Sequence, residues 1–424
     1  MESLRYDVLR DAVAGRGMAF RAVTELDPAG GDGDKVFPPT YQGGVYATEQ
    51  RIIGGQAVPC VLLDSVQSQA NRLEHALLDW HRGAPKGAKP FPLVQIDFSN
   101  SNAAEVGILS ALEAPHRIAD AVFLACEIEE HHDGATTRKP FRHPGNSAKG
   151  SLVGRSIDEA SSSRATGLFG LCPTALLFGM WDSHGARGGL GEKFQRALVS
   201  EIIGVGVTTD NRRPASRIDP LITIAGESLP ITVNDDKTWS LVEKGKGRSK
   251  LSEVGLGNVT PSLIDPKTHG FNHGGVTIQS ARQITVLSMP ALRRLRFPLA
   301  NKSAEEQTEV NTEARTVLAA LGLAAIAWQW ANGFSLRSRC DLVPRGQFAF
   351  SLLTPGRSDD FVLSPQEASD ILARAVEQAK SVGLPWPTRK EELPWKDGCL
   401  TLQPNEGLAR AVARSRELAA EKRD

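Results

Sequence analysis

The sequence has no surplus of charge of either sign and few aromatic residues. Its 424 residues hold 49 Lys and Arg against 49 Asp and Glu, and 6% are Phe, Trp or Tyr. This balance excludes a histone-like protein that binds polyanions through bulk positive charge, although local basic surfaces remain possible. An apolar fraction of 41% excludes a disordered chain, and the length permits two or three domains or one core with large insertions.

Cysteine pairs and long apolar runs are also missing. The five cysteines are scattered and form no C-x-x-C motif: Cys60, Cys126, Cys172, Cys340 and Cys399. Such a set is typical of reduced thiols in the cytosol. The most apolar run, Val317–Trp328, is too short to span a bilayer, and Met1–Asp11 is too mixed in charge for a signal sequence. We therefore expect a soluble cytoplasmic protein.

Three capping patterns predict where long helices begin. The pairs are Asp64 with Gln67, Ser303 with Glu306, and Ser364 with Glu367. They predict helices over 65–80, from 303 to about 332, and from 365 to the glycine at 383. On the first helix Gln67, Asn71 and Glu74 mark the polar side.

The remaining pattern mixes short strands with further helices. Strands are expected at 60–63, 168–181, 221–243, 277–297, 337–343 and 347–353, with helices over 192–203 and at the C-terminus. The chain shows no internal repeat, no regular βαβ rhythm and no clear break between two domains. The prediction is an α+β fold with insertions.

Two stretches without acidic residues indicate a polyanion partner. Residues 134–155 and 282–302 contain Lys and Arg but no Asp or Glu. Four further Lys and Arg residues lie between 244 and 250. Either stretch alone could be an ordinary solvated surface, but together they favour a basic groove.

The start of the first predicted helix, Ser65–Arg72, offers a second anion site. Free amides and the positive end of the helix dipole suit a phosphate there. An ordinary surface helix with an N-cap would have the same sequence pattern. Tyr41, Tyr46 and Trp181 could stack on bases, while core packing is the default for each.

No enzymatic motif is convincing. The glycine-rich run Gly185–Gly191 lacks the G-x-G-x-x-G order, and Asp182-Ser183-His184 are chain neighbours whose side chains point to opposite faces of an extended chain. The histidines near Cys126 do not have zinc-site spacing. Asp32 and Asp34, in an early glycine-rich turn, could form a cleaving carboxylate pair, but flexible-turn aspartates are more common.

Two long strings, FPPTYQGGVYATE at 37–49 and LLDSVQSQANRLE at 62–74, carry a family resemblance. Further strings follow in order at 178–185, 200–204, 216–221, 255–262, 274–277 and 292–297. Together they resemble the backbone RAMP subunit (seven-type, GSU-like family) of type I-U, now I-G, CRISPR-associated Cascade complexes. The resemblance runs from about residue 35 to 355, and the last seventy residues carry no recognised motif.

The resemblance implies an RRM-related, ferredoxin-like palm with inserted finger and thumb elements and a helical C-terminal tail. It also implies that copies polymerise along a guide RNA (crRNA), which then pairs with the target DNA strand in antiviral defence. Other Cascade subunits and a recruited helicase-nuclease would be partners, with cutting left to the latter. No catalytic residue, metal or cofactor is implied. The candidate for the finger is residues 134–155, and the candidate for the thumb is residues 236–280. Residues 361–424 are expected to form the helical extension.

The resemblance also suggests residues that contact nucleic acid. The candidates for guide RNA are Tyr41, Gly43, Gly44, Tyr46, Ser65, Gln67, Ser68, Asn71, Arg72, Arg212, Arg213, Arg217, Arg293 and Arg294. The candidates for target DNA are Arg138, Lys139, Arg142, Lys149, Lys246 and Arg248. Two alternatives stay open: an RNA-cleaving, type III-like subunit using Asp32 or Asp34, and an unrelated cytosolic α/β enzyme using the Asp182–His184 region.

Overall fold

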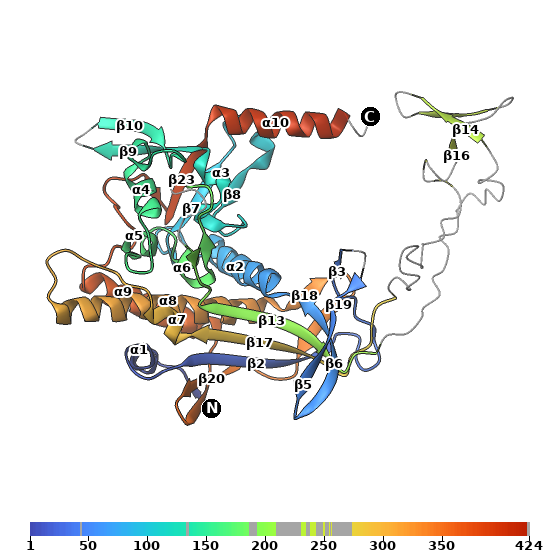
Figure 1. Cartoon of the computed structure of the whole chain (residues 1–424), viewed down its shortest axis with the longest axis horizontal. Helices are drawn as coiled ribbons and strands as arrows, with labels where there is room; N and C mark the ends of the chain where they lie inside the picture. The colour runs from blue at the N-terminus through green and yellow to red at the C-terminus, as the bar shows by residue number, and fades with distance from the viewer. Residues whose placement is uncertain are drawn as a thin grey trace.

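The chain folds into two sheets that share one large hydrophobic core, as the computed structural model in Figure 1 shows. It is a mixed α/β structure. The residues that it describes are 1–42, 45–132, 135–185, 193–208, 230–234, 238–242, 249–250, 254, 256 and 274–421.

The larger sheet has ten strands in the order β1-β21-β20-β2-β17-β13-β6-β5, and β19, itself paired with β18, joins β2. All of its pairs are antiparallel except β1 with β21. The bounds are β1 Glu2–Ser3, β2 Ala19–Pro28, β5 Thr48–Ile53, β6 Gln56–Asp64, β13 Leu198–Val205, β17 Ser280–Ser288, β18 Phe334–Arg337, β19 Cys340–Pro344, β20 Ala349–Thr354 and β21 Arg357–Val362.

In the middle of this sheet a strand–helix–strand pattern occurs twice. Along the chain, β2 is followed by helix α2 (Val66–Gly83), β13, β17, helix α8 (Ala304–Asn332) and β20. In space the four strands lie in the order β20-β2-β17-β13, which is 4-1-3-2 in chain order. Helices α2 and α8 pack on each other and on the inward side chains of these strands.

A buried polar network fixes the two helices to the sheet. Gln283 on β17 donates to Oε1 of Gln69 on α2 at 2.8 Å and to Oε1 of Gln329 on α8 at 3.0 Å. Ser200 on β13 donates to the same Gln69 oxygen at 3.0 Å. Because a buried polar group without a partner is costly, this set specifies how α2 and α8 sit on the strands.

Helix α8 is the core helix. Within the described part of the chain it is the one helix long and apolar enough to cross a membrane, and 89% of its most apolar window is buried inside the structure. Helices α1 (Tyr6–Ala14) and α9 (Pro365–Ser381) pack against it. The predicted capping boxes of α8 (Ser303, Glu306) and α9 (Ser364, Glu367) are both confirmed.

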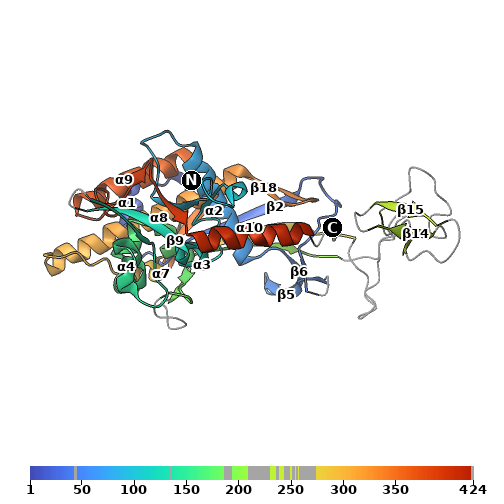
Figure 2. The ribbon, with the colours of Figure 1, turned by 90° about the horizontal axis from the view of Figure 1, so that it is seen from above.

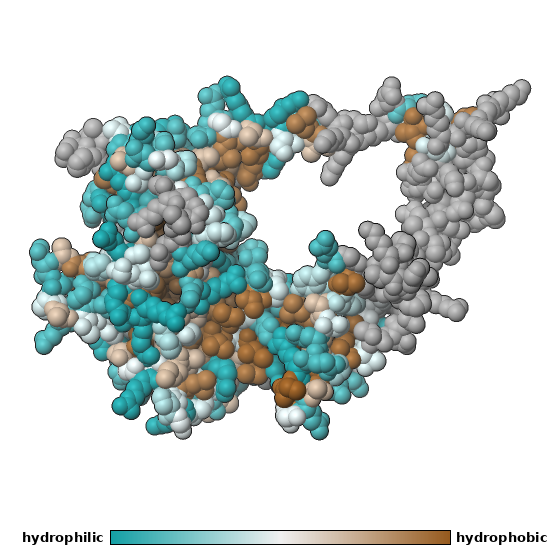
Figure 3. Space-filling model, in the orientation of Figure 1, coloured by the Kyte–Doolittle hydropathy of each residue, from teal (hydrophilic) through white to brown (hydrophobic). Residues whose placement is uncertain are grey.

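The second sheet has six strands in the order β10-β9-β23-β7-β8, with β22 paired to β23. The bounds are β7 Leu93–Asp97, β8 Ile108–Ser110, β9 Cys126–His132, β10 Ala135–Pro140, β22 Trp395–Lys396 and β23 Cys399–Pro404. Its middle strand β23 comes from the C-terminal region 361–424, which thus supplies a strand as well as α9 and α10 (Glu406–Glu421). Helix α10 runs along the top of the molecule in Figures 1 and 3 and faces the viewer in Figure 2.

Short helices and strands connect the two sheets. They are η1 (Ala104–Val106), η2 (Arg117–Ala119), α3 (Ala121–Leu124), η3 (Ser147–Lys149), α4 (Leu152–Asp158), α5 (Thr166–Phe169), α6 (Pro173–Phe178), β11 (Met180–Trp181), β12 (Lys193–Phe194) and α7 (Met289–Arg293). Three small sheets complete the set among the described residues. They are β11 with β12, β3 (Thr40–Tyr41) with β4 (Val45–Tyr46), and the three-stranded sheet of β15 (Trp239–Leu241), β14 (Pro230–Val233) and β16 (Ser249–Lys250).

Three predicted elements are wrong. The apolar run 168–181 forms α5, α6 and β11 rather than a strand, because a fully buried short helix has the same composition as a buried strand. Residues 192–203 form β12 and β13 rather than a helix, as the β-branched Val199, Ile202 and Ile203 favour. The region 277–297 is a strand only to Ser288, where α7 begins.

The thumb candidate 236–280 lies mostly outside the described residues. At its borders, β13 and β17 pair antiparallel as far as Val205 with Ser280, and Thr208 forms a bridge with Thr277. The chain therefore leaves and re-enters the larger sheet on neighbouring strands.

Candidate nucleic-acid interface

A cavity of about 590 Å³ opens between the first half of α2 and the β11–β12 pair. We call it the α2 pocket. The residues that line it are Gln67, Ala70, Asn71, Glu113, Pro115, His116, Arg117, Phe178, Gly179, Met180, Trp181, Lys193, Phe194 and Arg196. Two of the predicted RNA-contacting residues, Gln67 and Asn71, belong to this set.

One wall of the α2 pocket is the polar side of α2. The helix begins after Ser65, whose Oγ accepts a hydrogen bond from the Ser68 amide at 3.2 Å. Gln67 and Asn71 lie one turn apart and are exposed. Neither side-chain amide has a hydrogen-bond partner within the described part of the chain, so both remain available to a ligand.

Arg117, which lines the pocket, belongs to a buried ion pair. Arg117 Nε and Nη2 donate to the two carboxylate oxygens of Glu74 at 2.6 and 2.8 Å, and Nη1 donates to the Gly179 carbonyl at 2.7 Å. Burial raises the pKa of Glu74 to about 6, against the opposing effect of Arg117. Glu74 was predicted on the exposed side of the helix, and it is instead 2% exposed. The pair connects α2 to η2 and to the turn before β11.

The opposite wall carries cations and an aromatic ring. Trp181 on β11 is 41% exposed, and Lys193 Nζ on β12 lies 4.4 Å from its ring centroid. Arg196 is half-buried and makes no hydrogen bond or ion pair with any described residue. Burial, together with the nearby Arg117, lowers the pKa of Arg196. The Glu74 carboxylate opposes this lowering, but it is paired with Arg117. A half-buried guanidinium that forms no ion pair of its own with a described residue favours an anionic ligand.

Three other residues that were predicted to contact RNA, namely Ser65, Ser68 and Arg72, make contacts within the chain. Asp64, predicted as the helix cap, is fully buried and accepts hydrogen bonds from Ser68 Oγ and Gln69 Nε2 at 2.8 and 2.6 Å. Arg72 Nε donates to the same carboxylate at 2.8 Å. Ser65 is the N-cap. Ser68 and Arg72 are thus engaged within the chain, whereas Gln67 and Asn71 are not.

The predicted tyrosines lie on the small β3–β4 hairpin. Tyr41 is 42% exposed, whereas Tyr46 packs against the core cluster that contains Val36 and Val276. Burial raises the pKa of Tyr46, and a hydrogen bond with the Gly275 backbone opposes this. Gly43, Gly44, Arg212, Arg213 and Arg217 lie outside the described residues.

The two arginines of the 282–302 segment that were predicted to contact RNA differ in what they bind. Arg293 donates to the carbonyls of Ala12, Gly15 and Gly17, so it fastens the end of α1 and does not face a groove. Arg294 is exposed and donates to Gln195 Oε1 at 2.5 Å. Both belong to α7 or its C-cap, which corrects the expectation of a basic strand.

The basic finger candidate 134–155 proves to be balanced by acids from neighbouring elements. Arg138 pairs with Glu127 at 2.7 Å and Lys139 with Glu130 at 3.3 Å across the β9–β10 hairpin. Lys149 is exposed. Lys246 and Arg248 lie outside the described residues.

Arg142 cannot contact DNA, because its side chain is fully buried. Its guanidinium donates to Asp158 Oδ1 from Nε at 2.9 Å and to Asp182 Oδ2 from Nη2 at 2.6 Å. The acid-free stretch in the sequence concealed this pairing, since Asp158 and Asp182 lie beyond its end.

Residues of the two enzymatic alternatives make local contacts within the described part of the chain. Asp182 binds Arg142 and the Gly185 amide, while Ser183 Oγ lies 2.8 Å from His184 Nδ1 at an exposed position. Asp34 accepts a hydrogen bond from the Lys35 amide. Within the described ranges, no group of three or more His, Cys, Asp or Glu side chains could hold a metal ion.

Sequence reasoning missed several members of the α2 pocket, among them His116, Lys193 and Arg196. They lie far from α2 in the chain, and Lys193 and Arg196 fall in a region predicted as a helix. If 193–205 had been predicted as strands, Lys193 could have been placed on a strand next to Trp181. In the structure β11 pairs antiparallel with β12, and Trp181 lies opposite Lys193.

The comparisons with known proteins bear on this same region. No curated protein matches the chain. Residues 20–209 match the family described as CRISPR-associated protein GSU0053. Every residue that lines the α2 pocket falls inside the matched segment. Residues 20–209, a little under half of the chain, are thus similar to CRISPR-associated proteins of the GSU0053 type.

Proposed function

We propose that this protein is a non-catalytic, guide-RNA-binding backbone subunit of a type I-G (I-U) Cascade complex in the cytoplasm. Copies of it would polymerise along the guide and support its pairing with target DNA in antiviral defence. The family match supports the CRISPR association. The finer role rests on the family resemblance of the motifs and on the chemistry of the α2 pocket.

The strand order supports an RRM-related palm. A chain order of β2, α2, β13, β17, α8 and β20 with a spatial order of 4-1-3-2 is the βαββαβ plan of ferredoxin-like folds. The β5–β6 hairpin and the excursion after β13 are insertions into this plan. An inserted thumb would occupy the second of these positions.

The observation that carries the proposal is that side-chain amides and cations line one cavity. Gln67 and Asn71 on α2 line it together with Lys193 on β12 and Arg196 just after β12. RNA needs these groups in combination, because cations and neutral donors hold phosphates and 2′-hydroxyls, and an exposed indole such as Trp181 stacks on a base. Glu113 is the one carboxylate that lines the pocket, and Ser110 donates to it from its amide and hydroxyl.

Binding of the purified protein to a guide-length single-stranded RNA tests this proposal. We expect cooperative binding that weakens steeply with salt, and weaker binding to duplex DNA of equal length. The variant Arg196→Gln should lower RNA affinity about tenfold and reduce the salt slope by about 0.7, the value for one phosphate contact on a single strand.

The matched control is Arg16→Gln, which removes an exposed arginine far from the pocket in the chain. Its affinity should equal that of the unmodified protein. Equal affinities for the Arg196→Gln and Arg16→Gln proteins, both folded, would remove the α2 pocket from the RNA path. Tighter binding to duplex DNA than to RNA would contradict a guide holder.

A further inference from the structure

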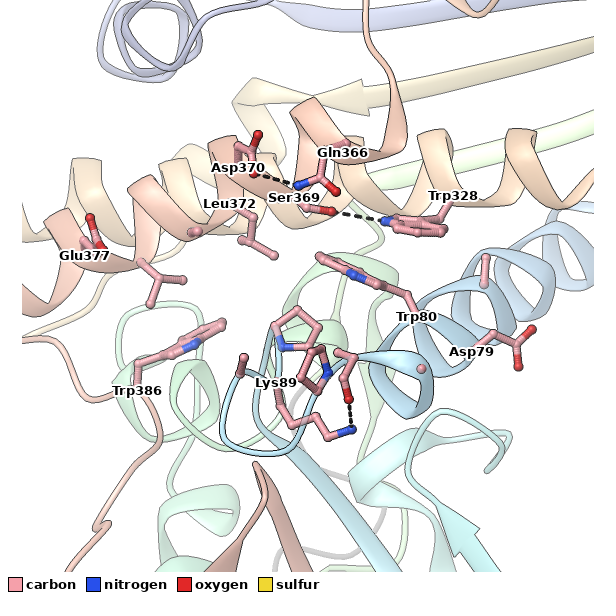
Figure 4. A pocket seen from close by; sticks show the side chains of 18 of the residues that line it. Asp79, Trp80, Lys89, Trp328, Gln366, Ser369, Asp370, Leu372, Glu377 and Trp386 are labelled. Atoms are coloured by element: carbon pink, nitrogen blue, oxygen red, sulfur yellow. Dashed lines mark hydrogen bonds between the residues drawn. The ribbon is translucent and has the colours of Figure 1, made fainter.

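A second cavity, of about 840 Å³, lies at the other end of α2. It is formed by the last turn of α2, the loop 83–90, α8, α9 and Trp386 (Figure 4). We call it the tryptophan pocket. It shares no lining residue with the α2 pocket.

Three tryptophans form the walls of this pocket. Trp80 and Trp328 stack with ring centroids 5.6 Å apart and planes at 19°, and Trp386 lies across the cavity from Trp80 in Figure 4. All three are half-buried. Among the described residues, no Lys or Arg lies over any of their faces, although four such cation–ring contacts occur elsewhere.

The charged residues of the pocket favour a cation. Asp370 and Glu377 lie on α9 at its border, and Asp79 lies on α2. The nearby Lys89 is already committed, because its Nζ donates to the carbonyls of His81 and Ala84 at 2.7 Å each and so caps the end of α2. Besides Lys89, Lys380 is the other positively charged residue that lines the pocket.

We propose that the tryptophan pocket binds an arginine side chain presented by another protein chain. A planar guanidinium stacks on an indole face and pairs with carboxylates through its several N–H donors, and this pocket supplies both partners. A nucleic acid is disfavoured, since its phosphates would meet Asp370 and Glu377. The long arginine stem would cover the apolar side chains of α9 at Ala373 and Val376. This proposal is independent of RNA binding.

Fluorine NMR of the full-length protein labelled with 5-fluorotryptophan tests the proposal. The seven tryptophans give separate probes, assigned by Trp→Phe substitution. A blocked peptide, Gly-Gly-Arg-Gly-Gly, should shift the signals of Trp80, Trp328 and Trp386 in a saturable way and leave that of Trp181 in place. The same peptide with citrulline, which keeps the shape without the charge, should bind at least tenfold more weakly.

Two variants on the exposed side of α9 make the test specific. Asp370→Asn with Glu377→Gln should weaken the arginine peptide at least fivefold, and Lys380→Glu should tighten it at least threefold. Asp341→Asn, an exposed carboxylate on β19, is the matched control and should change nothing. Unchanged signals of the other tryptophans verify the fold of each variant.

Three results would overturn the proposal. The first is equal binding of the arginine and citrulline peptides, and the second is an affinity that none of the α9 variants alters. The third is a shift of the same three tryptophan signals by single-stranded RNA or by a proline-rich peptide without arginine, since either would mean a different occupant.

Discussion

Arg72 and Asp64 form an ion pair in which the carboxylate is fully buried and the guanidinium is partly exposed, with 2.8 Å between Nε and Oδ2. The remaining guanidinium nitrogens of Arg72 donate to the carbonyls of Ser335 and Leu336 on β18. One arginine therefore connects the end of β6, helix α2 and β18. Its neighbour Asn71 makes no such contact, so the two residues of one predicted RNA site can be separated experimentally.

Arg72→Ala should lower the free energy of unfolding by about 1–3 kcal/mol, because it leaves a buried carboxylate with fewer donors. Asn71→Ala should change stability by less than about 0.5 kcal/mol while weakening guide RNA binding. Urea unfolding and RNA titration on both variants check this. A stable Arg72→Ala protein, or an Asn71→Ala protein with undiminished RNA affinity, would contradict it.

Arg142→Met should lower stability by about 3–5 kcal/mol, since it strands Asp158 and Asp182 in the interior without their cation. Lys149→Met, at an exposed position of the same basic segment, should stay within about 0.5 kcal/mol. Thermal or urea unfolding distinguishes the two. Similar unfolding midpoints for both variants would mean that Arg142 is not anchored as described.

His81 should make the protein less stable as the pH falls. Burial, with a smaller effect of Lys89, lowers the pKa of His81 to about 4, and its ring is 2% exposed. The folded protein holds this ring neutral, so its contribution is present above pH 6.5 and is lost progressively down to about pH 4. Over that interval the loss amounts to about 3 kcal/mol.

The test compares His81→Gln with His75→Gln, an exposed histidine on the same helix. Urea midpoints measured from pH 7 to pH 4 should fall less steeply for His81→Gln than for the unmodified protein. The His75→Gln protein should follow the unmodified protein. Parallel curves for all three would show that His81 does not contribute.

Paired target RNA should stay intact when it is incubated with the protein and Mg²⁺ or Mn²⁺. Asp32 and Asp34 lie in a turn, and no described cluster of ligands could hold a metal beside them. Gel analysis of end-labelled RNA is the measurement. Cuts at regular spacing that vanish in Asp32→Ala or Asp34→Ala would support the RNA-cleaving alternative instead.

Capping signals in the sequence predicted the starts of the long helices well. The capping boxes at Ser303 and Ser364 set the starts of α8 and α9, because the residues that satisfy the first amides are adjacent in the chain. At Asp64 the same rule was off by one residue. Ser65 is the N-cap, whereas the buried Asp64 carboxylate forms ion pairs with Arg72 and Arg337.

Pairings between distant segments could not be predicted. The basic stretch 134–155 looked free because the partners of Arg138, Lys139 and Arg142 lie before or after it in the chain. The α2 pocket likewise depends on Arg117 reaching Glu74 and on β12 lying against β11. Of the candidate site, the sequence could indicate Gln67 and Asn71, whereas the cations that face them depend on tertiary structure.

Thr208 and Thr277 form a bridge next to the paired strands β13 and β17, so residues 209–276 begin and end at neighbouring strands. The pairing register of these two strands does not depend on the length of the chain between them. A short glycine linker could replace residues 209–273 and leave unchanged both the hydrogen bonds of β13 and β17 and the bridge of Val276 with Val36. Related proteins could therefore vary the reach of this excursion freely, by insertion or deletion, while the platform that carries it stays constant.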